Sequence, residues 1–122
     1  MSKKKTLAQR KRDQKKWREA AMKRRALNRM APLINKKASA VIREIIQAVR
    51  QEKEYDYINI QIIDKCDWRF DPDFGSCKGF DKIRSYCQKE NLNCKFEMES
   101  HHGSGYDEIV YYWYELWVRV SW

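Results

Sequence analysis

Apolar residues recur in the middle of the chain at the spacing of one helix face. Over residues 33–53 they return every three or four positions, as in an amphipathic helix that buries a single stripe. We predict such a helix here, packed on a core. Pro32 lacks a backbone donor and restricts the residue before it, so any preceding helix should end or kink there. The apolar positions are Ile34, Ala38, Val41, Ile42, Ile45 and Val49.

Further along, apolar and polar residues alternate one by one, which is typical of half-buried strands. Alternation predicts strands at 56–64, 94–100 and 108–122. The Gly-containing segment 101–105 between the last two predicts a hairpin turn. A short helix should lie between the first two strands, with Ser76 as its N-cap and an end near Asn91. The predicted class is α+β, with a small β-α-β-β antiparallel or mixed sheet following the amphipathic helix.

The N-terminal quarter differs from the rest of the chain. Residues 6–31 contain no Gly or Pro and consist mostly of strong helix formers. Residues 1–16 have almost no apolar face, so they should form a basic arm that packs on nothing. From Trp17 onward a thin apolar stripe is present, and this part of the arm could pack partly on another surface. We therefore divide the chain into a basic helical arm, residues 1–31, and a small α+β domain, residues 32–122.

Positive charge is concentrated on this arm. The chain has 26 Lys and Arg against 17 Asp and Glu, and residues 1–37 hold 15 of these cations against Asp13 and Glu19. Residues 38–122 are net acidic, with 11 cations against 15 acids. Such asymmetry favours binding of DNA or RNA through phosphate contacts. The predicted contact residues are Lys3, Lys4, Lys5, Arg10, Lys11, Arg12, Lys15, Lys16, Arg18, Lys23, Arg24, Arg25 and Arg29.

One face of the last predicted strand is aromatic. Tyr111, Trp113 and Trp117 alternate on it, with Arg119 beside them. Exposed rings on a sheet can stack unpaired bases, with cation–π support from Arg. They can equally anchor a protein partner, since Trp, Tyr and Arg dominate binding hot spots. A third reading is that a helix covers this face and the rings belong to a second core layer.

The cysteines predict neither a metal site nor a disulfide framework. Cys66, Cys77, Cys87 and Cys94 lack the close pairing that structural zinc sites use. We expect reduced thiols, with Cys87 and Cys94 as small core residues.

Other polar clusters predict no catalytic or metal chemistry. The loop acids Asp64, Asp67, Asp71 and Asp73 do not match a calcium loop and suit turn formation. The adjacent His101 and His102 should point to opposite faces of a strand and so should not act together. We predict no catalytic residue, no metal and no cofactor.

These patterns lead to two alternative functions. No apolar run is long enough to span a bilayer, no secretory signal is visible, and the arm has no broad apolar face for a membrane surface. We expect a non-enzymatic intracellular protein that binds DNA, RNA or a ribonucleoprotein through its arm, in the cytoplasm, with a nuclear location as the alternative. The alternative is an adaptor or inhibitor of phage type that docks on a protein of nucleic-acid machinery through its acidic domain.

Overall fold

The computed structural model describes residues 4–66, 69–73, 75–105 and 109–122. In chain order the elements are helix α1 (Leu7–Gln51), strand β1 (Tyr57–Cys66), helix α2 (Lys78–Lys89), strand β2 (Asn93–Ser104) and strand β3 (Val110–Ser121). A long N-terminal helix, a second helix and an antiparallel sheet confirm the predicted α+β class.

Helix α1 runs without a break through Pro32, so the two helices predicted on either side of this proline are one element of 45 residues. The expectation that a helix ends there is wrong. Proline removes one backbone donor, which leaves the carbonyl of residue 28 without its helical partner. Asn28 is exposed, so water can satisfy this carbonyl. Leu27 and Ile34 are both buried in the core and hold the helix on either side of the proline.

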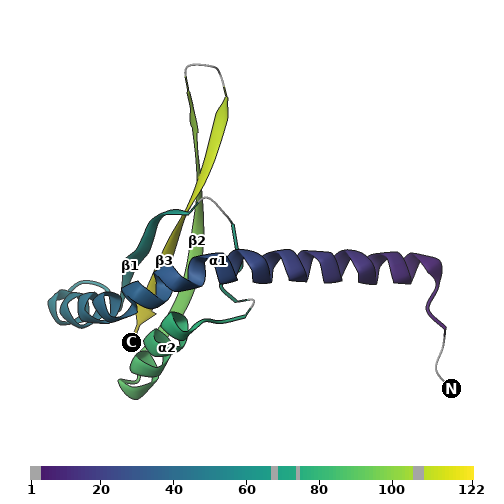
Figure 1. Cartoon of the computed structure of the whole chain (residues 1–122). Coiled ribbons are helices and arrows are strands. Elements are labelled where there is room, and N and C mark those ends of the chain that lie inside the picture. Colours follow the sequence, from purple (N-terminus) through teal and green to yellow (C-terminus); the bar gives the residue numbers. More distant parts are fainter. Residues whose placement is uncertain (1–3, 67–68, 74, 106–108) are drawn as a thin grey trace.

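The described strands form a three-stranded antiparallel sheet in the order β1-β3-β2. Strand β3 is central, and its Val118 lies between Ile60 of β1 and Phe96 of β2. Strand β2 continues through most of the predicted turn at 101–105 and ends at Ser104, and His101 pairs with Trp113 within the ladder. The prediction of a turn at the histidines is therefore wrong, and Figure 1 shows this hairpin projecting from the body of the sheet.

The core lies between the sheet and the two elements α1 and α2. Inward-facing residues of the strands join residues from α1 and α2 in a single buried cluster. The cluster contains no polar or charged residue among those described. The fully buried members with the largest side chains are Phe80, Ile34, Ile45, Ile63, Ile83, Leu116, Val118 and Val120, and the buried Cys87 takes its predicted place with them.

Helix α2 is capped by a side chain of α1 at its start and ends through its own backbone conformation. Cys77, rather than the predicted Ser76, is its N-cap residue, and it makes no side-chain cap. Asn35 of α1 supplies a cap instead, because its Oδ1 accepts a hydrogen bond of 2.6 Å from the Gly79 amide. At the other end Asn91 has a φ of 54°, the left-handed conformation that ends many helices, as predicted.

Neither helix in the described part of the chain has a stretch apolar and long enough to cross a bilayer.

Candidate nucleic-acid interface

The N-terminal half of α1 projects away from the sheet and from α2 (Figure 1). We call residues 7–26 the projecting helix. Within the described residues, α1 buries no side chain before Leu27, and Leu7 and Trp17 are 80% and 79% exposed. A helix rises about 1.5 Å per residue, so these 20 positions extend about 30 Å into solvent.

The sequence explains why this half does not pack on the core. The buried stripe of α1 includes Leu27. Traced from Leu27 toward the N-terminus, the same face of the helix recurs every three or four residues. Lys23, Lys16, Asp13 and Gln9 occupy these positions, with only Ala20 between them. A face of this composition cannot be buried without desolvating charges, so the part of the helix on the N-terminal side of Leu27 lies outside the core.

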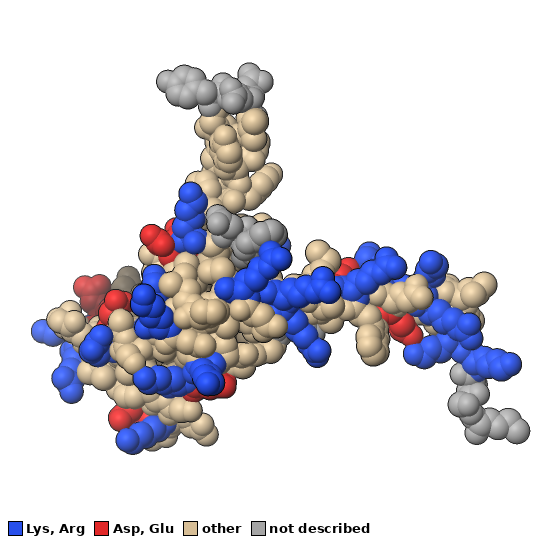
Figure 2. All heavy atoms as spheres, viewed as in Figure 1, with Lys and Arg blue, Asp and Glu red and all other residues tan. Residues whose placement is uncertain are grey.

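Cations cover the projecting helix on all sides. Figure 2 shows lysine and arginine along most of its visible length. Every predicted contact residue that the structure describes is exposed, whereas Lys3 lies outside the described residues. The acids are few. Lys5 Nζ donates to Asp13 Oδ2 at 2.6 Å, and this contact lowers the pKa of the Asp13 carboxyl below its ordinary value.

This charge works against the stability of the helix itself. The first turn of α1 contains no acid, and Lys4 and Lys5 precede it, where the helix dipole disfavours positive charge. Like charges also face each other four residues apart, at Lys11 and Lys15 and at Arg12 and Lys16. Phosphate groups placed along the helix would remove both penalties. The capping box of Thr6 and Gln9 offsets part of the cost.

The aromatic face of β3 is uncovered. Both α1 and α2 pack on the face that carries Leu116, Val118 and Val120. We call the opposite side of the sheet the open face. Within the described residues no helix lies on it, so of the three alternative readings the one in which a helix covers this face is wrong. The open face carries Asn59, Glu97, Glu99, His101, Trp113, Glu115, Trp117 and Arg119.

The aromatic residues of this face already have partners within the protein. The Trp113 ring stacks on His101 at 5.6 Å, and Trp117 Nε1 donates to Glu115 at 2.9 Å. Arg119 lies over the ring of Tyr57 at 4.5 Å. Tyr111, near the end of the hairpin, is 54% exposed. The hairpin and the projecting helix point in different directions (Figure 1), so the two predicted contact regions do not form one continuous surface.

The predicted acidic loop serves structural roles where it is described. The Asp71 carboxylate accepts a hydrogen bond from the Asp73 amide at 3.0 Å and lies 3.8 Å from Lys23 at the root of the projecting helix. Asp64 belongs to β1, and Asp67 lies outside the described residues. A hollow of about 610 Å³ beside this loop contains as many acids as cations, which does not favour a polyanion.

Sequence reasoning passed over one group of side chains. Glu99, His101 and Glu115 converge on the open face, with their ligand atoms all within 4.8 Å of one another. His102 points to the other face, beside Tyr112, so the predicted opposite orientation of the histidines is confirmed. Extending the alternation of Glu97 and Glu99 by one step would have placed His101 with the acids.

Comparison with known protein families, curated proteins and solved structures gave no significant match to this chain.

Proposed function

We propose that this protein is a non-enzymatic intracellular protein that binds nucleic acid, or a ribonucleoprotein, through the projecting helix of α1. The observation that carries the proposal is a helix exposed on all sides whose cations reduce its own stability. Within residues 7–26 the sequence places nine Lys and Arg against Asp13 and Glu19. These cations lower the stability of the helix, and a bound polyanion that neutralises them would account for their presence.

The dimensions of the helix suit this role. A duplex carries about one negative charge per 1.7 Å of its axis, so about 30 Å of helix spans more phosphates than it has cations. Each phosphate neutralised releases condensed counterions, and that gain in entropy does not depend on base sequence. Long Lys and Arg side chains on several sides of one helix suit a groove, where phosphates lie on both flanks.

The experiment is a titration of duplex DNA and of single-stranded RNA at several salt concentrations. With about five phosphate contacts, log affinity should fall against log salt with a slope of about −4.5 on duplex DNA, or about 500-fold between 50 and 200 mM. Replacing Arg10, Lys11, Arg12, Lys15 and Lys16 with Gln keeps good helix propensity and should remove most of this slope.

The control removes the same charge from elsewhere. Arg43, Lys53, Lys65, Lys78 and Lys89 are exposed on the domain, and replacing them with Gln should change the slope little. Equal losses in the two variants would show that only net charge matters. A five-Gln helix variant that binds as tightly as the parent at low salt would refute the proposal.

A second function is favoured by the end of the β2–β3 hairpin. Ile109, Val110, Tyr111 and Tyr112 are each about half exposed or more, an apolar group that a protein partner could cover. This supports the alternative of an adaptor or inhibitor that docks on nucleic-acid machinery. Under this alternative, Tyr111→Ala together with Tyr112→Ala abolishes recovery of a protein partner from nuclease-treated lysate and leaves the salt slope unchanged.

A further inference from the structure

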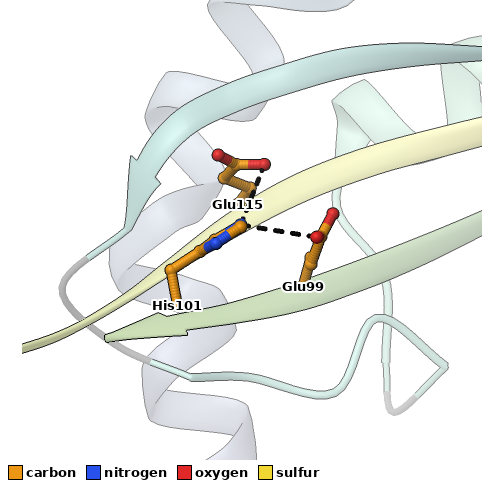
Figure 3. A group of neighbouring side chains, drawn as sticks. All are labelled: Glu99, His101 and Glu115. Carbon is orange, nitrogen blue, oxygen red and sulfur yellow. Dashed lines mark ion pairs between the residues drawn. The ribbon is translucent and has the colours of Figure 1, made fainter. Parts of the chain in front are cut away.

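Glu99, His101 and Glu115 come together on the open face, with Glu99 and His101 on β2 and Glu115 on β3 (Figure 3). His101 Nε2 lies 3.2 Å from Glu115 Oε2 and 3.6 Å from Glu99 Oε1. The three side chains thus present one nitrogen and two carboxylate oxygens to a common point.

The strands and their neighbours fix this arrangement. Glu99 and His101 are two residues apart on β2, so they share a face, and Glu99 pairs directly with Glu115 across the ladder. Trp117 Nε1 donates to Glu115 Oε2, and the Trp113 ring stacks on His101 with 17° between the planes. Such neighbours orient side chains that bind a metal.

Two features of this group are electrostatically unfavourable unless a cation binds. His101 Nε2 is buried and has no hydrogen-bond partner among the described residues. Glu99 and Glu115 place like charges directly opposite each other, which destabilises an antiparallel pair. A cation between the three groups would satisfy the nitrogen and offset the repulsion.

We propose that Glu99, His101 and Glu115 bind a zinc ion. Zinc binds His nitrogen and Glu oxygen at about 2.0–2.2 Å, so neighbouring ligand atoms of a tetrahedral site lie about 3.4 Å apart. The two distances from Nε2, 3.2 and 3.6 Å, lie on either side of this value. The imidazole ligand favours zinc over magnesium and calcium, which prefer oxygen.

The site can admit the ion and keeps one position open. The Glu99 side chain is 61% exposed, so its carboxylate can move aside for the ion. Three protein ligands leave the fourth position of zinc to water. Glu99 also borders a hollow of about 370 Å³ on the open face, lined by Trp117 and Arg119, so a small ligand at the fourth position would have space beside the ion.

The first test uses the unaltered full chain and ZnCl₂. The chain has only two histidines, and they lie on opposite faces of the same strand, so NMR can follow the two rings separately. One equivalent of zinc should shift the His101 ring signals and leave those of His102 in place. Co²⁺ in place of zinc should give the visible absorption of a tetrahedral site without a thiolate charge-transfer band.

The second test measures zinc affinity of matched variants by calorimetry. His101→Gln and Glu115→Gln should each weaken binding by more than about 100-fold, because loss of an outer-shell partner alone costs about 10–100-fold. Trp117→Phe, which removes such a partner, should fall within that lower range. His102→Gln and Glu97→Gln should bind as the parent does. Thermal melts without metal establish that each variant is folded.

Several outcomes would overturn the proposal. Zinc that shifts neither histidine, or both equally, does not occupy this site. Binding that survives in His101→Gln but is lost in Cys94→Ser places the metal on thiols. If the parent binds no zinc at all, the three residues form only a polar contact on the open face. Should His101→Gln not fold, Glu99→Gln and the unaltered chain decide the question.

Discussion

The contact between α2 and α1 at Gly79 offers a sharp test of the packing that orients the projecting helix. Gly79 is the second residue of α2, and a Cβ built there would lie 2.7 Å from the Ile34 carbonyl oxygen and 2.9 Å from the Asn35 Cα. Both neighbours are backbone atoms of α1, which cannot rotate away. Gly79→Ala should therefore push the start of α2 away from α1.

The net effect follows from three opposing contributions. Alanine gains up to about 1 kcal/mol of helix propensity over glycine. Overpacking costs about 1–3 kcal/mol, and a shift that breaks the Gly79–Asn35 hydrogen bond costs about 1 kcal/mol more. We expect a net loss of about 2 kcal/mol, or a fall in Tm of roughly 6–12 °C for a domain of this size.

The measurement is chemical and thermal unfolding followed by circular dichroism. Ser85→Ala is the control, because Ser85 is exposed on the same helix and the change should raise stability by a few tenths of a kcal/mol. A Gly79→Ala protein that melts at or above the parent temperature would refute the close packing of α2 on α1.

Two further predictions concern the arm and the thiols. A chain lacking residues 1–25 should still unfold cooperatively by calorimetry. Removing residues 1–31 also removes the buried Leu27 and should lower the free energy of unfolding by about 2–5 kcal/mol more. If the chain lacking residues 1–25 shows no cooperative transition, residues 1–25 are needed for folding. The Cys87 thiol donates to Cys94, and with the charge of Arg84 this lowers the pKa of Cys94 to about 7. Alkylation of Cys94 by iodoacetamide should thus reach half its maximal rate near pH 7. The free energy of unfolding should rise from pH 7 to pH 9, the ordinary pKa of a thiol, because in this range Cys94 is still protonated in the unfolded chain and already deprotonated in the folded one. Cys87→Ala should move the alkylation midpoint toward pH 9, and an unmoved midpoint would contradict the hydrogen bond as its cause.

The strands and the part of α1 that packs on the core could be predicted because most of their buried residues lie on one side. Ile58 and Ile60 alternate with polar neighbours, and so do Val118 and Val120, because the helices cover one face of the sheet and leave the other open. The same one-sided burial sets the spacing of Ile34, Ala38, Val41 and Ile45 along α1. Where buried residues recur with a regular period, the pattern of apolar residues alone predicts the correct helix or strand.

The errors arose where a distant contact overrides a local signal. Pro32 is a strong local breaker, yet core contacts on both sides keep the helix continuous. Gly103 favours a turn, but the Trp113 ring lies against its backbone, and the ladder continues past it. Glu115 joins His101 only through the register of β2 with β3, which no single-strand pattern contains.

The continuity of α1 changes what phosphate binding would do for the rest of the protein. A flexible arm would tether the domain and leave its orientation free. Here the residues that would hold phosphates and the residues that fill the core belong to one helix, with Leu27 and Ile34 buried on either side of Pro32. A nucleic acid bound along the projecting helix would therefore hold the sheet at a defined angle. It would also fix the direction in which the hairpin points (Figure 1), so the two proposed contact regions would act in a set geometry.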